Sequence, residues 1–316
     1  MKANKLYKYI NLLVRIVIGV IAIGYIYIKL KEEFFLNLDV ISGQNIVYIA
    51  IVIAIMLLFV NWGLEALKWR YAISKVERIS FRKAFNLTIT GITLGIITPN
   101  RVGEIPARAL LLNRDSFKEL TLKTLVASFS QVMITFFIGI IGFITIYDKF
   151  NFGLNIGLVF IFLSILFLLL LVIYFKIGLL QKFFNKINYF RVQQIFKALS
   201  DFSDKELLNL LGFSLLRYLV FSFQFWLVLF AFGINLVTLE DILLIPVCFL
   251  FASIIPTILI SEIGVRSSVA LLIFGVVSNM DVQIILASVL LWFINVGLPA
   301  IIGLINLNQF KIIKEN

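Results

Sequence analysis

Long apolar stretches dominate the chain and predict membrane-spanning helices. A helix needs about 20 apolar residues to cross a bilayer, and the chain has such runs at 10–28, 46–67, 124–147, 153–175, 207–233 and 283–307. In lipid, only helices and closed barrels satisfy the hydrogen bonds of the backbone. None of the runs shows the period of two that marks a β-barrel strand, so we predict helices. The pattern predicts an all-α, polytopic membrane protein with about six full spans in a single transmembrane domain, residues 1–316.

Two further apolar runs are too short to cross a membrane, and each stops at a proline. Residues 84–98 end at Pro99 and residues 242–255 end at Pro256, and each run continues into a charged segment that becomes apolar again. Broken or re-entrant helices have this pattern. We therefore predict two re-entrant helical hairpins, over residues 84–115 and 242–276.

The basic residues are unevenly distributed between the loops. When both hairpins are treated as re-entrant, only Lys29, Lys31 and Lys149 fall on one side, and nearly all other Lys and Arg residues fall on the opposite side. Basic loops mark the cytoplasmic side, so we predict a multi-pass protein of the cytoplasmic membrane with both termini in the cytoplasm. The hairpins then enter from opposite sides, which predicts an inverted repeat of the kind found in secondary transporters.

Two segments outside these spans also carry predictions. The N-terminus is basic and then apolar but shows no small-residue cleavage site, so we expect a retained first helix rather than a signal peptide. Residues 176–206 place apolar residues at helical spacing with basic residues between them. This segment is either an amphipathic helix on the cytoplasmic leaflet or a solvated connector helix packed on its neighbours.

Composition narrows the chemistry. Hydrophobic residues make up 61% of the chain and charged residues 14%, against about 25% charged in soluble domains. The chain has no histidine, a lone Cys248 and no P-loop motif, which argues against imidazole chemistry, Cys/His metal sites and NTP hydrolysis. We expect no metal and no cofactor. The net charge of +11 suits anionic lipid surfaces rather than nucleic acid.

The two proline breaks carry the same order of residues: a proline, a helix-capping residue, a glutamate, and an arginine four positions after the glutamate. The first break has Pro99, Asn100, Glu104 and Arg108, and the second has Pro256, Ser261, Glu262 and Arg266. A charge in the middle of a membrane costs about 2.5–3.5 kcal/mol, so these residues need a compensating role. Each Glu–Arg pair is either a self-neutralising structural staple or part of a functional cavity.

In the functional interpretation, arginines in a polar cavity bind an anionic group. The fork of an arginine side chain matches phosphate oxygens, and helices starting at Asn100 and Ser261 would direct backbone N–H groups to the same place. Arg101 has no partner at helical spacing, which makes it the best candidate for a phosphate ligand.

Three secondary candidates lie within spans. Glu65, next to Trp62, ends the second span and either anchors it at the membrane interface or faces the cavity. Arg217 and Gln224 are seven residues apart on one helix face, and we expect Arg217 to snorkel from near the cytoplasmic end. The small-residue pattern GITLG at 91–95 predicts close helix packing.

The two breaks also carry a family resemblance. The sequence P-N-R-V-G-E-x-x-x-R-A-x-L-L at 99–112 resembles a motif of the lysylphosphatidylglycerol synthase transmembrane-region family, also called flippase-like proteins. A second family motif resembles residues 255–275, with I-P, I-G-V-R and L-L-x-x-G. The likeness extends over about 10–307. It implies functional roles for the residues that match the two motifs, which are Pro99, Arg101, Gly103, Glu104, Arg108, Pro256, Gly264, Val265 and Arg266.

The chain departs from the family pattern in two respects. Ser261 and Glu262 stand where the family has paired glycines, and Ser267 follows Arg266 where the family has a glutamate. The soluble domain that aminoacylates phosphatidylglycerol in fused members of the family is missing, so aminoacyl transfer does not carry over. What the resemblance implies is a membrane region that moves lipid across the bilayer.

Three functions follow from these observations. The first is a non-enzymatic transporter or flippase for a phospholipid or related lipid with an anionic or zwitterionic headgroup. The second is a membrane-embedded enzyme acting on a lipid-linked substrate, with Glu104 and Glu262 as acid and base. The third is a non-catalytic partner of a separate lipid-modifying enzyme.

Overall fold

In the computed structural model of the protein, residues 47–96, 98–150, 156–175, 201–257 and 260–307 are described, and these are helical, with turns and loops between the helices. Five helices are long and apolar enough to cross a membrane. They are α3 (Tyr48–Ile73), α6 (Phe117–Thr145), α7 (Ile156–Phe175), α10 (Asp204–Ala231), and the continuous helix α14 (Asp281–Trp292), η3 (Phe293–Gly297) and α15 (Leu298–Leu307). They coincide with five of the six predicted spans and have the length and apolar composition of spans. The span predicted at 10–28 and residues 176–200 of the predicted connector lie outside the described residues.

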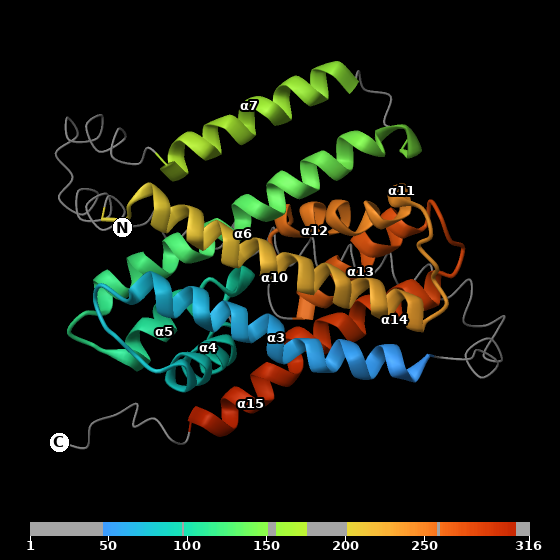
Figure 1. The fold of residues 1–316 in the computed structure, drawn as a ribbon. Helices are drawn as coiled ribbons and strands as arrows, with labels where there is room; N and C mark the ends of the chain where they lie inside the picture. Colours follow the sequence, from blue (N-terminus) through green and yellow to red (C-terminus); the bar gives the residue numbers. More distant parts are fainter. Residues whose placement is uncertain (1–46, 97, 151–155, 176–200, 258–259, 308–316) are drawn as a thin grey trace, which may run out of the picture.

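The helix is broken at both predicted places. In the first break, α4 (Phe81–Gly95) is followed by a 3₁₀ turn, η1 (Pro99–Arg101), and by α5 (Glu104–Leu112). In the second, α12 (Leu244–Ile254) is followed by α13 (Ile260–Phe274). Figure 1 shows α4 and α5 between the end of α3 and the start of α6, at one end of the long helices, whereas α12 and α13 lie toward the other end. The two broken helices therefore lie toward opposite ends of the bundle; their re-entry into a membrane and the internal repeat of the two halves stay predictions.

Small residues let the first hairpin fold back tightly on itself. A Cβ atom on Gly91 would lie 2.7 Å from Cγ of Arg108, and one on Gly95 would lie 2.8 Å from the backbone nitrogen of Glu104. Contacts this short are not tolerated between real atoms, so α4 and α5 approach as closely as they do because these positions lack a side chain. The close packing predicted from GITLG at 91–95 is confirmed.

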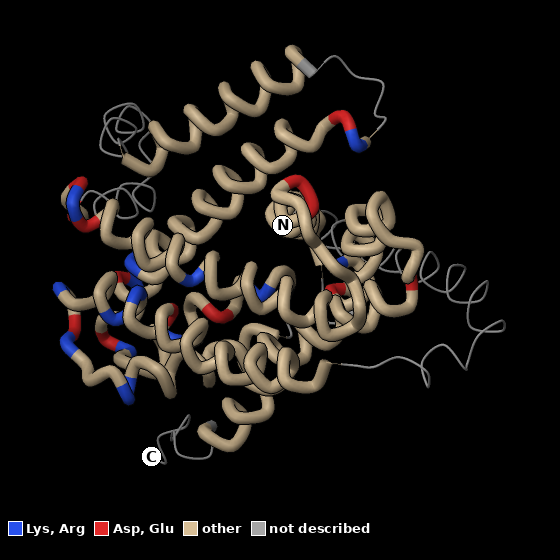
Figure 2. The backbone as a smooth tube through the Cα atoms, turned by 45° about the vertical axis from the view of Figure 1, so that its right-hand side comes forward, with Lys and Arg blue, Asp and Glu red and all other residues tan. Residues whose placement is uncertain are grey.

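The ends of the bundle differ in charge. Figure 2 shows most of the blue Lys and Arg segments gathered at one end, on the left. The loops and helix ends there include Lys75, Arg78, Arg82, Lys83, Arg114, Lys118 and Lys205. At the opposite end, the described loops carry Asp148, Lys149, Glu240, Asp241 and Asp281. There, the Nζ of Lys149 pairs with Asp241 at 3.1 Å and with Glu240 at 3.3 Å.

The long helices surround the breaks unequally. α10 packs along α3, and α6 packs against α12 where Gly139 meets the side chain of Leu250. α7 contacts mainly α6 and keeps most of its apolar surface exposed. The enclosed interior therefore lies between α3, α6, α10, α14 and the two hairpins.

Candidate functional site

The tips of the two hairpins are joined by hydrogen bonds. The backbone N–H of Asn100 donates to the carbonyl oxygen of Thr257 at 3.0 Å, and the backbone N–H of Thr257 donates to Oδ1 of Asn100 at 2.6 Å. The Thr257 hydroxyl donates to the same Oδ1 at 3.2 Å. We call this set of contacts the Asn100–Thr257 clasp. It brings residues from the two breaks, 157 positions apart in the sequence, into direct contact.

Asn100 is not the N-cap that the sequence predicted. Its φ of 46° and the φ of 56° at the following Arg101 are left-handed, and α5 begins only at Glu104. Asparagine adopts this conformation more readily than most residues, which suits it to this position. Two left-handed residues in succession reverse the chain and direct Arg101 into the interior.

Gly103, not Asn100, occupies the N-cap position of α5, and the turn that leads to it is held by Thr98. The hydroxyl of Thr98 accepts a hydrogen bond from the backbone N–H of Gly103 at 2.8 Å and donates to the carbonyl oxygen of Gly95 at 2.6 Å. A Cβ on Gly103 would lie 2.6 Å from Cγ2 of Thr98, so glycine is required there. The prediction for Ser261 was also wrong, because α13 already begins at Ile260 and Ser261 lies inside its first turn.

Glu65 is the centre of a buried charge cluster. Its carboxylate pairs with Nη1 of Arg108 at 2.9 Å and with Nζ of Lys68 at 2.8 Å. Nη2 of Arg108 also reaches Oε2 of Glu104 at 3.3 Å. The side chains of Lys68, Arg108 and Glu65 are only 1%, 4% and 6% exposed. Glu65 therefore faces the interior instead of anchoring α3 at an interface, and we call Glu65, Lys68 and Arg108 the sealed cluster.

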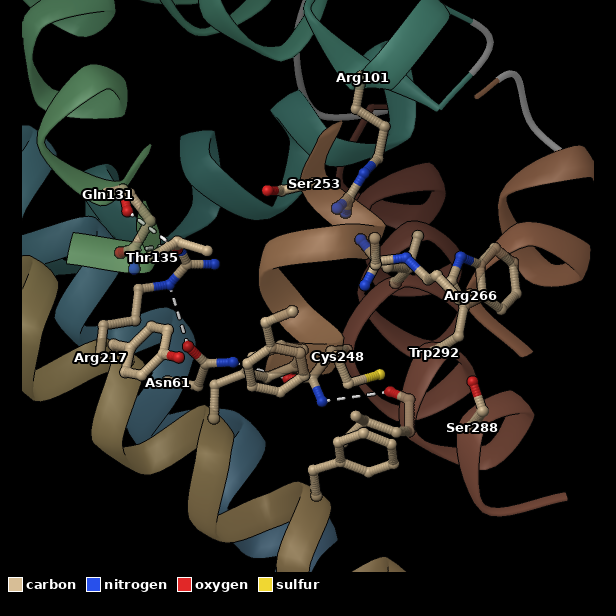
Figure 3. A pocket seen from close by; sticks show the side chains of 18 of the residues that line it. Asn61, Arg101, Gln131, Thr135, Arg217, Cys248, Ser253, Arg266, Ser288 and Trp292 are labelled. Atoms are coloured by element: carbon tan, nitrogen blue, oxygen red, sulfur yellow. Dashed lines mark hydrogen bonds between the residues drawn. The ribbon is translucent and has the colours of Figure 1, made fainter. Parts of the chain in front are cut away.

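Three other arginines face a cavity. The side chains of Arg101, Arg217 and Arg266 are 22%, 20% and 29% exposed. Contrary to the prediction, Arg101 is paired, at 3.7 Å with Glu104 and 3.5 Å with Glu262, but these are contacts between charges without a hydrogen bond. In Figure 3 the guanidinium groups of Arg101 and Arg266 point toward one another.

Arg266 and Arg217 are held by their Nε atoms. Nε of Arg266 donates to Glu262 at 2.9 Å, and Nε of Arg217 donates to Oδ1 of Asn61 at 3.0 Å. Within the described residues, both Nη groups of Arg266 have no hydrogen-bond acceptor. We call Arg101, Arg217 and Arg266 the cavity arginines, because each is oriented by the protein and keeps donors for a ligand.

The sequence placed Arg217 too near the membrane surface. It lies near the midpoint of Asp204–Ala231, about 20 Å from either end at the helical rise of 1.5 Å per residue. Its Nη1 pairs with Glu65 at 3.2 Å, and its guanidinium lies 4.9 Å from the ring centre of Trp62. Arg217 therefore points inward and does not snorkel.

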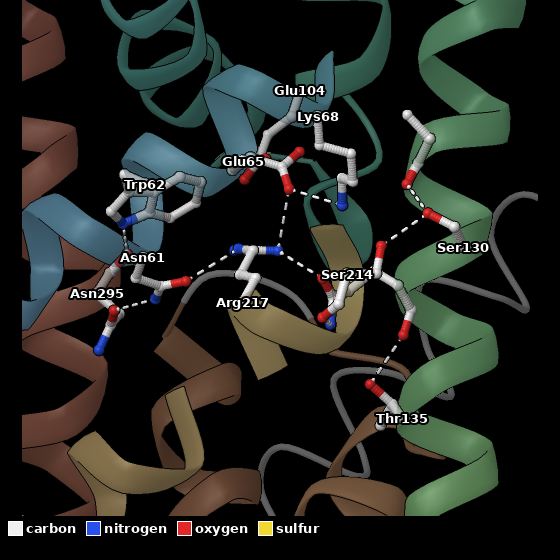
Figure 4. A network of polar contacts seen from close by, with 12 residues as sticks. Asn61, Trp62, Glu65, Lys68, Glu104, Ser130, Thr135, Ser214, Arg217 and Asn295 are labelled. Carbon is white, nitrogen blue, oxygen red and sulfur yellow. Dashed lines mark hydrogen bonds and ion pairs between the residues drawn. The ribbon is translucent and has the colours of Figure 1, made fainter. Parts of the chain in front are cut away.

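Uncharged polar residues of other spans complete the site, and most of them carry no motif that marks them in the sequence. Asn61 of α3 donates to Oδ1 of Asn295 at 2.7 Å, and Gln131 of α6 accepts from Arg217 at 3.4 Å. Gln224, a predicted candidate, contacts Asn61 at 3.4 Å and donates to the carbonyl oxygen of Ala54 at 2.8 Å. Figure 4 shows Arg217 between Asn61 and Glu65 in this network. Together these groups form a polar layer halfway along the helices.

Two adjoining cavities open onto the cavity arginines. The carboxylate chamber, of about 340 Å³, is lined by Glu65, Lys68, Glu104, Arg108 and Glu262 together with the three cavity arginines. The aromatic chamber, of about 210 Å³, shares those arginines and is otherwise lined by residues that include Asn61, Tyr218, Phe221, Phe249, Ser288 and Trp292. In the described part of the chain, no group of three or more His, Cys, Asp or Glu residues is placed to hold a metal ion.

The charges of the site do not cancel. Five basic side chains (Lys68, Arg101, Arg108, Arg217 and Arg266) share three carboxylates (Glu65, Glu104 and Glu262). The difference is two positive charges, in a part of the protein that is shielded from bulk water. Because unpaired charges are costly in such surroundings, the site suits an anionic ligand with oxygen acceptors.

These features define a class of protein: a polytopic helical membrane protein in which two opposed, broken hairpins enclose a cationic site at the middle of the spans. Residues 12–303 match the family model of the lysylphosphatidylglycerol synthase transmembrane region. The chain therefore belongs to that family. A comparison with curated proteins gives no match.

Proposed function

We propose that this protein carries a phospholipid with an anionic phosphate across the cytoplasmic membrane, without catalysing a reaction. The observation that carries the proposal is the set of three cavity arginines with unused donors between two opposed hairpins. Phosphate oxygens are the natural acceptors for such guanidinium groups, and the excess of two positive charges favours an anion. Membership of the family supports lipid as the source of that anion.

The wall of the carboxylate chamber supports a ligand with acyl chains. Val102 and Val132, which are 59% and 43% exposed, line this chamber along with the exposed Ser253. Exposed apolar side chains at a polar cavity allow a headgroup to enter while its chains stay in the hydrocarbon. This arrangement fits a lipid better than a soluble anion.

The position of the site supports transport from one leaflet to the other. Transporters bind their substrates near the middle of the membrane, between discontinuous helices, and the polar layer lies halfway along α3, α6 and α10. The basic end of the bundle supports an orientation with that end in the cytoplasm. The C-terminal end of α15 lies at the same end (Figure 1), which supports a cytoplasmic C-terminus.

A reconstitution experiment tests the proposal. The protein is inserted into liposomes that contain a phospholipid with a fluorescent acyl chain, and movement between leaflets is followed by chemical quenching of the outer leaflet. We expect protein-dependent movement that falls by about tenfold or more in Arg101→Ala, because one charge-assisted phosphate contact is worth about 1.5–3 kcal/mol. Arg82→Ala, at an exposed site in the basic end, is the matched control.

Three outcomes would each contradict a part of the proposal. Absence of any protein-dependent lipid movement would contradict transport, and co-purification with a lipid-modifying enzyme would then favour the role of a non-catalytic partner. Product formation from a lipid-linked substrate by the purified protein would favour the embedded enzyme. Equal rates for wild type, Arg101→Ala and Arg82→Ala would remove the cavity arginines from the mechanism.

A further inference from the structure

The helix that contains Asn295 is irregular where it meets the polar layer. Between α14 and α15, residues Phe293–Gly297 form the π-helical turn η3, and the backbone N–H of Leu298 donates to the carbonyl oxygen of Phe293, five positions earlier. Single turns of π-helix are rare and are frequent at functional sites. The irregular turn of this helix therefore contains the residue that joins it to the polar layer.

A proline after this turn deprives the carbonyl oxygen of Asn295 of its α-helical donor. In an α-helix this oxygen accepts from the N–H of the residue four positions later, but that residue is Pro299, which has no N–H. Nε1 of Trp62, in α3, donates to the Asn295 carbonyl oxygen at 3.2 Å. Because both residues are buried, this hydrogen bond is shielded from water, and it fixes the indole ring of Trp62 from the side of η3.

The side chain of Asn295 orients the residue next to Trp62. Its Nδ2 donates to the carbonyl oxygen of Leu291 at 3.2 Å, and its Oδ1 accepts from Nδ2 of Asn61 at 2.7 Å. Oδ1 of Asn61 then accepts from Nε of Arg217 at 3.0 Å. The nitrogen of an amide side chain only donates and its oxygen only accepts, so this order of hydrogen bonds determines the orientation of both amides.

Arg217 is held by two neighbouring residues of α3 that are both hydrogen-bonded to Asn295. Asn61 accepts from its Nε, and the ring of Trp62 lies 4.9 Å from its guanidinium. Figure 4 shows Asn61 bonded on one side to Asn295 and on the other to Arg217. Gln224 also accepts from Asn61, but at the longer distance of 3.4 Å. Within the described residues, no hydrogen bond or ion pair joins Asn295 to Arg217 directly, so Asn295 acts on Arg217 through Asn61 and Trp62.

The bond to Asn61 is the shortest contact that orients the Arg217 guanidinium. Nη1 of Arg217 lies 3.2 Å from a carboxylate oxygen of Glu65 and 3.4 Å from Oε1 of Gln131, at or beyond the usual upper limit of hydrogen-bond distances. In the part of the chain that the structure describes, Nη2 has no acceptor. The Nε bond therefore determines the plane of the guanidinium and the direction in which Nη2 points.

We propose that Asn295 is the positioning residue of Arg217. Its amide orients Asn61, and its carbonyl oxygen, which Pro299 leaves without an α-helical donor, holds Trp62. Together they keep the Arg217 guanidinium in the one orientation in which Nη2 is available to an anionic ligand. This inference rests on the proposed function, because it assigns a role at the same cavity.

A double-mutant cycle tests the inference. Wild type, Asn295→Leu, Arg217→Met and the double variant, each in nanodiscs, are equilibrated with increasing amounts of phosphatidylglycerol that carries a fluorescent acyl chain. We expect Arg217→Met to weaken binding by about tenfold or more, and Asn295→Leu by about threefold or more. In the Arg217→Met background, Asn295→Leu should change the affinity by less than about twofold, because the effects of residues in one hydrogen-bond network are not additive.

Two further variants separate positioning from stability. Gln283→Leu removes a buried amide of α14 that lines neither chamber, and this matched control should bind the lipid as wild type does, whatever its melting temperature. Trp62→Phe removes the indole N–H that bonds the Asn295 carbonyl oxygen and keeps an aromatic ring beside Arg217. We expect it to weaken binding by about threefold, and by less than about twofold in the Arg217→Met background. It tests the inference even if Asn295→Leu does not fold.

The outcomes distinguish this inference from the proposed function. An equal loss of affinity from Asn295→Leu in both backgrounds, or no loss in either, would overturn the positioning role and leave lipid binding by Arg217 intact. Wild-type affinity in Arg217→Met would contradict the role of Arg217 in the proposed function and overturn the inference with it. Coupling between Asn295 and Arg217 without any lipid movement in liposomes would support the inference and contradict transport.

Discussion

The sealed cluster and the cavity arginines contain the same kinds of side chain but differ in what their donors contact. In the sealed cluster, both Nη groups of Arg108 pair with glutamates, and its side chain is only 4% exposed. In the cavity set, Arg101 has no side-chain hydrogen bond in the described part of the structure, and Arg266 uses only its Nε. The sequence left open whether the Glu–Arg pairs are structural staples or binding groups. Arg108 has the contacts of a structural staple, whereas Arg101, Arg217 and Arg266 are the binding groups of our proposal.

The sealed cluster gives the largest expected effect. Arg108→Gln removes a partner from Glu65 and from Glu104 in the interior, and breaking a buried pair costs about 3–5 kcal/mol. We expect a strong loss of thermal stability in detergent, measured by intrinsic fluorescence and by size-exclusion chromatography. Arg82→Gln, at an exposed position, is the control. If Arg108→Gln unfolded at the wild-type temperature, the division into a structural and a binding set would be wrong.

Replacing a cavity arginine is expected to cost little stability and to weaken lipid binding strongly. Arg266→Gln leaves Glu262 paired with Arg101 and changes a side chain that is 29% exposed, so its stability cost should stay within about 1 kcal/mol. Binding of fluorescent phosphatidylglycerol should weaken by about tenfold or more. The two variants, measured together for melting temperature and for lipid affinity, test the comparison directly. A stability loss in Arg266→Gln as large as that of Arg108→Gln would remove the distinction.

The left-handed turn before Arg101 allows a finer test. Asn100→Ala loses the side-chain part of the Asn100–Thr257 clasp and also places a Cβ in a conformation with φ of 46°, which costs about 1–2 kcal/mol. Asn100→Gly loses the same hydrogen bonds without this strain. We therefore expect Asn100→Ala to melt below Asn100→Gly, and both below wild type. Equal melting temperatures for the two variants would mean that the left-handed backbone at residue 100 costs no stability when alanine occupies it.

The ion pair between Lys149 and Asp241, outside the predicted spans, gives the smallest expected effect on stability. Hydrogen bonding to Thr238, together with Lys149, lowers the pKa of the Asp241 carboxyl to about 2, against about 3.9 for an unfolded chain. The stability that the ionised Asp241 contributes is fully present above the pKa that this carboxyl has in the unfolded chain. It is lost as the pH falls through the pKa that the carboxyl has in the folded protein. Lys149→Met should lower the free energy of unfolding by less than about 1 kcal/mol at neutral pH. The difference from wild type should shrink between about pH 4 and pH 2, and a difference that grew on acidification would contradict this assignment.

The sequence predicted the fold well where one local property decides the structure. The length of an apolar run determined whether a helix crosses, and Pro99 and Pro256 marked where helices break. The order of charges at the breaks identified Arg101, Glu104, Arg108, Glu262 and Arg266, all of which line the carboxylate chamber. These predictions needed no knowledge of which helices pack together.

The predictions that failed depend on contacts between distant segments. The prediction of a helix cap at Asn100 was wrong because the Asn100 side chain bonds Thr257 and Gly103 occupies the N-cap position. Arg217 was placed too shallow because the side chains that draw it inward, Glu65 and Trp62, belong to the distant helix α3.

The residues of the polar layer share one property that is visible in the sequence. Asn61, Gln131 and Asn295 are uncharged polar residues in apolar runs, and no local motif sets them apart. Each lies near the midpoint of its span, and that common depth could have been read from the sequence alone. What the sequence could not supply is the pairing, since the hydrogen bond between Asn61 and Asn295 joins residues 234 positions apart.

The depth of Arg217 also has an electrical consequence. A site halfway across a membrane lies at about half of the membrane potential, whichever side a ligand enters from. Moving one elementary charge through the full potential is worth about 2.3 kcal/mol per 100 mV, so reaching the midpoint is worth about half of that. Occupancy of this site by a singly charged anion would therefore change about sevenfold with a voltage of about 100 mV, without any change in the contacts described above.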